Sequence, residues 1–170
     1  KNKPKVQASD LLTEEEVRIK NIPRIRDVLK LIELLGDMGV EVKENSPFDF
    51  SLKASEIDIA FLETDSYKEK SAALRGSVMI VGPLLGRFGK AFIPKPGGDK
   101  IGRRRLDTHF IGFQKLGAKF DFDPVKQQYS VDASALKGTY MLLDEASVTG
   151  TANIIMAAVL AKGKTTIYNA

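Results

Sequence analysis

The sequence has no cysteine, no tryptophan and a single histidine, His109, among its 170 residues. Without cysteine the chain can form neither a disulfide nor a thiolate metal site, and one histidine argues against a clustered zinc site. No apolar run approaches the roughly 18 residues that a membrane-spanning helix requires. These absences favour an ordinary globular protein that is not held together by disulfides or metal and does not cross a membrane.

What is present is typical of such a protein, with 43% apolar and 28% charged residues. The length suits one domain or part of a larger one. A net charge of +4 permits an anionic ligand but is too small to indicate a nucleic-acid-binding protein. The polar start, Lys1–Asp10, has no signal-peptide character, so we expect a cytoplasmic location. Because the chain ends abruptly within a predicted strand over 165–170, we expect a piece of a longer protein.

Three similar segments organise the chain. They begin at Leu12, Leu85 and Leu160, with offsets of 73 and 75 residues. Each is typical of a helix end, a turn and a short strand. Repetition of this length indicates copies of one supersecondary unit packed around a shared core, although chance likeness between two α/β segments is the alternative. We therefore expect repeat units at roughly 12–84 and 85–159 and the start of a third at 160–170.

Hydrophobic spacing predicts the elements within each unit. Apolar residues from Val28 to Met38 recur at helical spacing, and this helix and the one over 107–117 stop at glycines, Gly39 and Gly117. Two further helices are apolar on more than one face and should be buried. They span 71–85 and 147–160, and strands are predicted over 49–53, 56–61, 128–133 and 139–143.

The segment PKPGGDKIGRRRLD, from Pro94 to Asp107, combines three glycines with five basic residues and one inner carboxylate, Asp99. Glycine lets the backbone approach a ligand closely, and arginine grips phosphate or carboxylate bidentately. The segment therefore fits an anionic small molecule, with Asp99 as a candidate proton donor. Partial burial would favour the protonated form of Asp99, whereas the nearby cations would oppose it. A solvated basic surface loop is the alternative.

Helix starts supply two further candidate anion sites. Arg104 and Arg105 precede the helix that begins near Leu106, where free N–H groups favour an anion; the alternative is a surface pairing with Asp107. Ser147 opens the last apolar helix, either as its N-cap or beside a bound phosphate.

Two charged or titratable residues fall within predicted helices. Arg75 lies in the apolar helix over 71–85, where an unpaired charge is costly unless it faces a ligand or a polar edge. His109 lies on a mainly apolar helix face, which is more typical of a satisfied core histidine than of a catalytic base.

Four stretches carry a resemblance to a known family. They read LRGS at 74–77, GPLLGRFG at 82–89, PGGDKIGRR at 96–104 and DEASVTGTAN at 144–153. Together they resemble the UDP-N-acetylglucosamine 1-carboxyvinyltransferase family of enolpyruvyl transferases, with a likeness over about 11–170. The resemblance implies an α/β (α+β) fold of repeated βαβαββ units in an inside-out α/β barrel. About two of the three units of one domain would be present, without the family's second domain.

The resemblance also implies an activity. These enzymes transfer the enolpyruvyl group of phosphoenolpyruvate to the 3′-hydroxyl of UDP-N-acetylglucosamine and release phosphate, the first committed step of peptidoglycan synthesis. The implied partners are these two small molecules and the second domain of the same parent chain, with no cofactor, no metal, no nucleic acid and no membrane. Asp99 stands at the proton-donor position, where most members carry the cysteine that fosfomycin alkylates. The resemblance therefore implies an enzyme insensitive to fosfomycin, and a fragment that is inactive alone.

The resemblance implies site residues as well. Arg75 matches an arginine that contacts the UDP-sugar, and Arg104 matches one that contacts both substrates. Arg105 stands where proline is common, and Glu145-Ala146 stand where Lys-Val is frequent. The start of the chain resembles a Lys-Asn pair that meets phosphoenolpyruvate, although Lys3–Asp10 is more polar than the family's helix there. The remaining implied substrate contacts are Leu106, Asp107, Thr108, Ser147 and Val148, with Lys1 and Asn2 as the Lys-Asn pair.

Two other functions stay open at this point. The enolpyruvyl transferase that acts on shikimate 3-phosphate shares the fold but lacks the Gly-Gly-acid loop. A noncatalytic anion- or nucleic-acid-binding module would use the basic run Lys100–Arg105, but it would also require aromatic side chains for stacking. Only Phe92 and Phe110 lie near that run in the sequence.

Overall fold

The computed structural model describes residues 8–94 and 106–170. Its strands are β1 (Glu16–Lys20), β2 (Glu41–Ser46), β3 (Asp49–Lys53), β4 (Lys90–Pro94), β5 (Lys119–Asp123), β6 (Gln128–Asp132), β7 (Tyr140–Leu142) and β8 (Thr166–Tyr168). Its α-helices are α2 (Arg26–Asp37), α3 (Asp65–Ala72), α4 (Val81–Phe88), α5 (Asp107–Lys115) and α6 (Val148–Ala158). Three short 3-10 helices complete the described part: η1 (Asp10–Leu12), η2 (Ala60–Glu63) and η3 (Arg75–Ile80).

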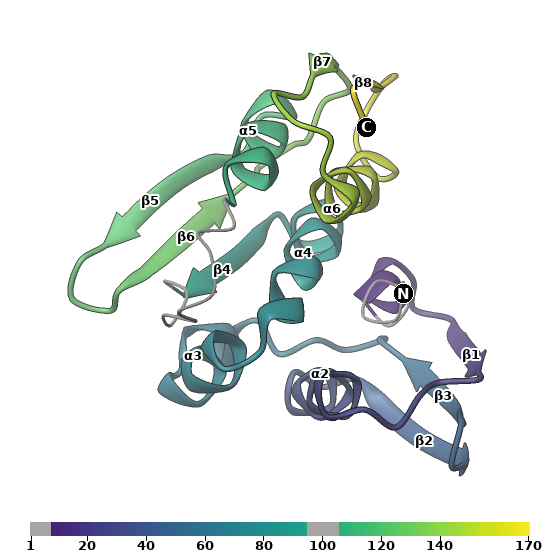
Figure 1. Ribbon diagram of the computed structural model, residues 1–170. Helices are drawn as coiled ribbons and strands as arrows, with labels where there is room; N and C mark the ends of the chain where they lie inside the picture. Colours follow the sequence, from purple (N-terminus) through teal and green to yellow (C-terminus); the bar gives the residue numbers. More distant parts are fainter. Residues whose placement is uncertain (1–7, 95–105) are drawn as a thin grey trace.

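Two three-stranded antiparallel sheets repeat one arrangement (Figure 1). In the first sheet β3 lies between β1 and β2, and in the second β6 lies between β4 and β5. In each sheet an α-helix, α2 or α5, connects the two outer strands, and the central strand follows last. The two segments predicted as copies therefore share a β-α-β-β topology, while the boundaries of the repeat units stay a prediction.

The helices of these two units end where the sequence predicts. The α2 helix is followed by Gly39 with φ +101°, and α5 is followed by Gly117 with φ +105°. Positive φ favours glycine because a Cβ crowds the backbone there. At Gly39 a Cβ would also lie 2.6 Å from the carbonyl oxygen of Glu56. The stops at these glycines are confirmed, and they let each chain turn directly into the next strand.

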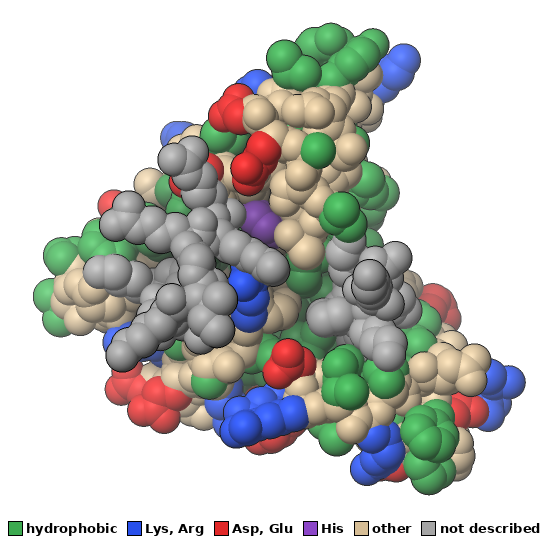
Figure 2. All heavy atoms as spheres, in the orientation of Figure 1, with side chains coloured by type: hydrophobic (Ala, Val, Ile, Leu, Met, Phe, Trp, Pro, Cys, Tyr) green, Lys and Arg blue, Asp and Glu red, His purple; other side chains and the backbone are tan. Residues whose placement is uncertain are grey.

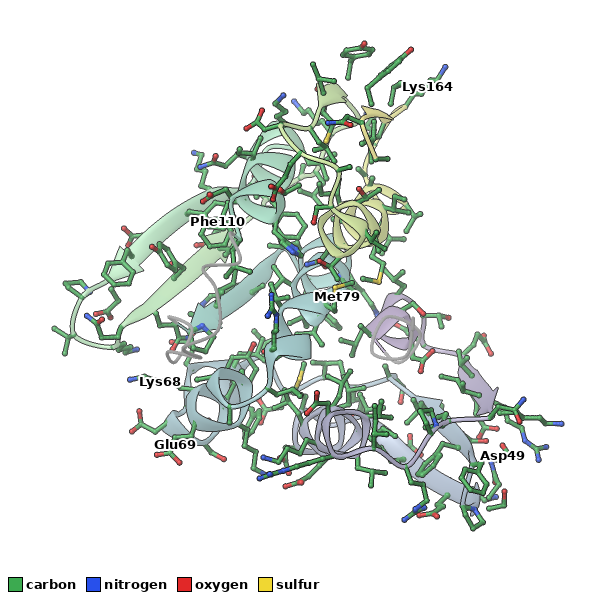
Figure 3. The ribbon with its side chains drawn as sticks, viewed as in Figure 1. Asp49, Lys68, Glu69, Met79, Phe110 and Lys164 are labelled. Carbon is green, nitrogen blue, oxygen red and sulfur yellow. The ribbon has the colours of Figure 1, made fainter. Side chains whose placement is uncertain are left out.

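Helices α4 and α6 lie side by side between the two sheets (Figure 1). Their close approach depends on small residues. A Cβ on Gly82 of α4 would lie inside van der Waals contact with the backbone oxygen of Asn153 in α6, and a Cβ on Gly112 of α5 would overlap the side chain of Ile154. Helices α4 and α5 thus each pack closely against α6 at a glycine. One apolar cluster runs through this meeting point, and Met79, buried at 2% exposure, lies near its middle (Figure 3).

The predicted strand over 56–61 is wrong. This segment is a loop that leads into η2. Its amides bond elsewhere: the N–H of Asp58 donates to the carbonyl of Met38, and the Asp58 carboxylate accepts the N–H of Phe61 at 3.2 Å. An aspartate that accepts an amide three residues ahead favours a helical turn over a sheet ladder. The apparent apolar alternation of 56–61 therefore does not produce a strand.

The predicted single helix over 71–85 is also wrong. The chain instead forms the end of α3, an extended residue at Leu74 (φ −120°, ψ 106°), then η3 and α4. The Ser77 hydroxyl donates to the carbonyl of Leu74 at 2.6 Å and also contacts the Ser71 carbonyl at 2.8 Å. A serine side chain that satisfies backbone carbonyls offers an alternative to a continuous helix. The prediction missed α3, whose buried Tyr67 donates a 2.9 Å hydrogen bond to the carbonyl of Phe92 in β4.

The end of the described chain matches its predictions more closely. Strands β7 and β8 pair in parallel, as the predicted strands over 139–143 and 165–170 allow. Helix α6 lies where the apolar pattern over 147–160 predicts it, but it buries only one face. Val148, Ile155 and Val159 are 71%, 48% and 60% exposed, so the expectation of a fully buried helix is wrong for α6. Within the described residues, every helix is too short or too polar to span a membrane.

Replacing Gly82 with alanine should destabilise the chain, because the new methyl group would collide with the backbone of α6 at Asn153. We expect a loss of about 1–3 kcal/mol in the free energy of unfolding, the range for overpacking. Gly86→Ala is the matched control on the same helix, since its Cβ would meet its nearest atoms at 3.4 Å. Urea denaturation of both variants measures the difference. Equal stability of the two variants would contradict this account of the α4–α6 contact.

Candidate functional site

Several predicted site residues lie outside the described part of the structure. These are the proton-donor candidate Asp99, the arginines Arg104 and Arg105, and the pair Lys1 and Asn2. The described site residues fall on three elements: the start of η3, the start of α5 and the start of α6. The structure therefore describes the site at the N-terminal ends of η3, α5 and α6.

The starts of α5 and α6 lie against each other. The Thr108 hydroxyl of α5 approaches a carboxylate oxygen of Glu145 at 3.4 Å, and a Cβ on Gly150 of α6 would lie 2.8 Å from the Thr108 methyl group. Thr108 is buried, whereas Asp107 and Glu145 are exposed. The structure thus brings together two predicted segments, 106–108 and 145–148, that are separated by nearly forty residues of sequence.

Ser147 is the N-cap of α6, as one of its two sequence interpretations predicts. Its side-chain oxygen accepts the N–H of Gly150 at 3.1 Å, and its carbonyl accepts the N–H of Thr151 at 2.8 Å. The cap aligns the first turn of an 11-residue helix whose partial positive charge lies at this end. Ala146 and Val148 on either side are exposed. The start of α6 is therefore both capped and open to solvent.

Arg75 is exposed and begins η3, so the argument from a charge inside an apolar helix does not apply to it. Its segment is nevertheless tied to α6. The carbonyl of Val78 in η3 accepts a 2.8 Å hydrogen bond from the Asn153 side chain. Arg75 therefore sits at the exposed start of a turn that is anchored to the same helix as Ser147.

His109 is buried beside Asn153, as the core interpretation of this histidine predicts. His109 is 3% exposed, and its Nδ1 atom lies 3.0 Å from Nδ2 of Asn153. Burial lowers the pKa of His109 to about 4, because desolvation disfavours the imidazolium. The purple side chain in Figure 2 is this single histidine, visible in a hollow near the centre of that face. A neutral imidazole thus lies one residue along α5 from Thr108.

One titratable residue was missed by the sequence reasoning. Asp10 in η1 is 3% exposed, and its Oδ2 atom has no hydrogen-bond partner. Desolvation raises the pKa of this carboxyl to about 7. No pattern in the sequence marks it, because an aspartate after a polar stretch normally indicates a solvated helix start.

The described residues also form a separate groove of about 470 Å³. It lies at the C-terminal end of α4, beside the loop over 133–136. None of the predicted site residues lines it. In the described ranges there is also no group of three or more histidine, aspartate or glutamate side chains that could hold a metal ion.

Solved structures share this architecture. The enolpyruvyl transferase NikO from Streptomyces tendae superposes with a TM-score of 0.77 at 16% identity, over 96% of this chain and 37% of its own. An EPSP synthase from Acinetobacter baumannii gives a TM-score of 0.65 at 16% identity, over 95% of this chain and 38% of its own. The fold is therefore that of the enolpyruvyl transferases, the inside-out α/β barrel that the sequence led us to expect.

Sequence comparison identifies the family within this class of fold. The model of the EPSP synthase (3-phosphoshikimate 1-carboxyvinyltransferase) family matches residues 6–170, and the chain belongs to that family. A curated relative from Bacteroides fragilis, named UDP-N-acetylglucosamine 1-carboxyvinyltransferase, is 63% identical over 94% of this chain. One of the same name from Porphyromonas gingivalis is 58% identical over 96% of it. The chain spans only 37% and 38% of the lengths of these two relatives.

The buried side chains of His109 and Asp10 should change the free energy of unfolding with pH in opposite directions. An unfolded histidine binds a proton below about pH 6.5, but native His109 does so only near pH 4, so its stabilising contribution is lost as the pH falls through this window. Native Asp10 keeps its proton up to about pH 7, whereas the unfolded carboxyl loses it near pH 4. Its contribution is therefore lost as the pH rises.

Asp10→Asn should consequently reveal the effect of His109 on the free energy of unfolding, because the opposing effect of Asp10 is removed. Between about pH 4 and 6.5 the variant's free energy of unfolding should rise with pH by up to a few kcal/mol, whereas the unaltered chain should show a flatter profile. Asp121→Asn, at an exposed position of β5, is the control and should follow the unaltered chain. Urea denaturation at several pH values measures all three. Parallel profiles for Asp10→Asn and the unaltered chain would contradict the assigned burial of Asp10.

Proposed function

We propose that this chain contributes to the transfer of the enolpyruvyl group of phosphoenolpyruvate to the 3′-hydroxyl of UDP-N-acetylglucosamine, with release of phosphate. The observation that carries the proposal is the 63% identity to a relative of that name across nearly the whole chain. The juxtaposition of segments 106–108 and 145–148 supports it, because both are expected to contact the UDP-sugar. The remaining parts of the site would come from a second domain of the same parent chain.

Shikimate 3-phosphate is the competing acceptor, since the family model takes its name from the enzyme that uses it. Sequence favours the UDP-sugar. The Bacteroides fragilis and Porphyromonas gingivalis relatives, both named for UDP-N-acetylglucosamine, are 63% and 58% identical to this chain, whereas the superposed EPSP synthase is 16% identical. The Gly-Gly-acid segment around Asp99 points the same way. We therefore rank the shikimate acceptor second.

The described geometry suits a nucleoside diphosphate. The start of α6 offers backbone N–H groups and the positive end of an 11-residue helix, a combination that favours phosphate. Ser147 and Val148 would contact the diphosphate there, next to Glu145 and Ala146. The start of α5, with Leu106, Asp107 and Thr108, lies beside it and would complete the contact to the UDP-sugar. Arg75 would approach the same ligand from the exposed start of η3.

The chemistry requires a proton donor and positive charge. The acceptor hydroxyl loses its proton and its oxygen adds to C2 of phosphoenolpyruvate, while C3 gains a proton. Phosphate then leaves from C2 as C3 gives up a proton, and the enol double bond re-forms. We propose Asp99 as the group that protonates C3. Arg104, Lys1 and Asn2 would bind phosphoenolpyruvate, with Arg105 alongside Arg104, because arginine and lysine stabilise the phosphate and carboxylate charges. No cofactor is required for this addition and elimination.

The proposed reaction also places the protein in a pathway. Its product, an enolpyruvyl UDP-sugar, would be the first committed intermediate of peptidoglycan synthesis. We propose a cytoplasmic location for this reaction.

Asp99→Asn should abolish most turnover in a protein of the relatives' full length that contains this chain. Asparagine keeps the shape of the side chain but cannot supply the proton, and general acid catalysis is worth roughly 10²–10⁴-fold in rate. Phosphate release from phosphoenolpyruvate that depends on UDP-N-acetylglucosamine measures the effect. Asp121→Asn is the matched control and should retain full activity. Equal activity of the two variants would remove Asp99 from the mechanism.

The same position should decide the response to fosfomycin. A carboxylate lacks the soft sulfur nucleophile that the epoxide alkylates, so we expect the unaltered protein to remain active and unmodified in the presence of the drug. Asp99→Cys should gain one covalent adduct and lose activity with time. Intact-protein mass spectrometry detects the adduct. Covalent modification of the unaltered protein, or a cysteine variant that stays unmodified while active, would contradict the assignment of this position.

A further inference from the structure

The buried amide of Asn153 connects three separate elements. Its Oδ1 atom accepts the backbone N–H of Gly82 in α4 at 2.9 Å, and its Nδ2 atom donates to the carbonyl of Val78 in η3 at 2.8 Å. The remaining N–H of Nδ2 faces Nδ1 of His109 in α5 at 3.0 Å. Asn153 itself is 0% exposed, so every hydrogen bond it makes is protected from water.

The orientation of this amide follows from its two backbone partners. The N–H of Gly82 can only donate, and the carbonyl of Val78 can only accept. A flipped amide would place two donors together at Gly82 and two acceptors together at Val78, and both pairs would be buried and unsatisfied. The side-chain nitrogen of Asn153 therefore faces His109, as a donor.

This orientation determines the protonation of the imidazole. A ring nitrogen that receives a hydrogen bond must carry a lone pair, so Nδ1 of His109 cannot hold a proton. The single proton of a neutral ring then lies on Nε2, on the far side of the ring from Asn153. We infer that Asn153 is a positioning residue that holds His109 as the neutral Nε2–H tautomer, so that the residue after Thr108 on α5 presents a fixed N–H donor.

A fixed donor at this place has a use in the proposed reaction. His109 follows Thr108 directly on α5, and Thr108 lies against the start of α6, where we place the diphosphate. A neutral N–H donor can orient an oxygen acceptor of the UDP-sugar without exchanging a proton with it. This use rests on the proposed function, whereas the tautomer itself rests only on the hydrogen bonds of Asn153.

Nuclear magnetic resonance of the 170-residue chain, labelled with ¹⁵N-histidine, tests the tautomer directly, because His109 is its only histidine. At neutral pH we expect a proton bound to Nε2 and none on Nδ1. A proton on Nδ1 in the unaltered chain would overturn the inference without any variant being made.

Two variants separate positioning from packing. Asn153→Asp replaces the donor by a carboxylate that attracts a proton, so we expect the proton of His109 to appear on Nδ1. Ile154→Ala is the matched control: it removes a neighbouring buried side chain of α6 but leaves the amide in place, so the Nε2–H tautomer should persist. A folded Asn153→Asp chain with an unchanged tautomer, or an altered tautomer in Ile154→Ala, would overturn the inference.

The role in the reaction has its own readout. In a protein of the relatives' length, Asn153→Asp should raise the KM for UDP-N-acetylglucosamine about tenfold, the scale of one lost hydrogen bond to a charged group, with a smaller effect on kcat. Ile154→Ala should leave that KM near its original value. A changed tautomer with an unchanged KM would contradict the role of His109 in positioning substrate. Loss of all UDP-sugar dependence in the unaltered protein would instead refute the proposed function and leave the tautomer standing.

Discussion

The contact between α4 and α6 at Gly82 and Asn153 is the constraint on which the rest of the described structure depends. Because glycine has no side chain, the two helices approach until the Asn153 backbone touches Gly82. At that distance the Asn153 amide can reach the backbone of both α4 and η3 and the ring of His109. One close crossing therefore fixes the relative positions of η3, α5 and α6, the three elements whose starts carry the described site residues.

The described site residues lie around this close helix contact, which holds them in place. The site's predicted contacts lie at helix starts, among them the exposed Arg75 and the half-buried Ser147, while His109 and Asn153, further along α5 and α6, are buried and hydrogen-bonded. The partial positive charge of a helix start favours anions, and the buried core holds these starts in place. The starts of η3, α5 and α6 thus belong to segments that resemble the enolpyruvyl transferases, and they also carry the described residues of the proposed site. Further residues of the proposed site come from segments outside the described ranges, including Asp99.

Much of this could be predicted from sequence because local rules decide it. Gly39 and Gly117 end their helices through backbone sterics, and Ser147 caps α6 through its own hydroxyl. The errors arose where a side chain redirected the backbone: Asp58 produced a turn in place of a strand, and Ser77 accompanied a break in an apolar run. Pairings between distant segments, such as Thr108 with Glu145 or His109 with Asn153, leave no mark in a single sequence. The burial of Asp10 likewise depends on tertiary packing alone.

The most direct measurement of the central claim is a competition between acceptors. A protein of the relatives' length that contains this chain would receive phosphoenolpyruvate with equal amounts of UDP-N-acetylglucosamine and shikimate 3-phosphate, and mass spectrometry would identify the enolpyruvyl product. The account predicts that the enolpyruvyl UDP-sugar forms and the shikimate product does not. Formation of the shikimate product alone, or of neither product by a folded protein, would contradict it.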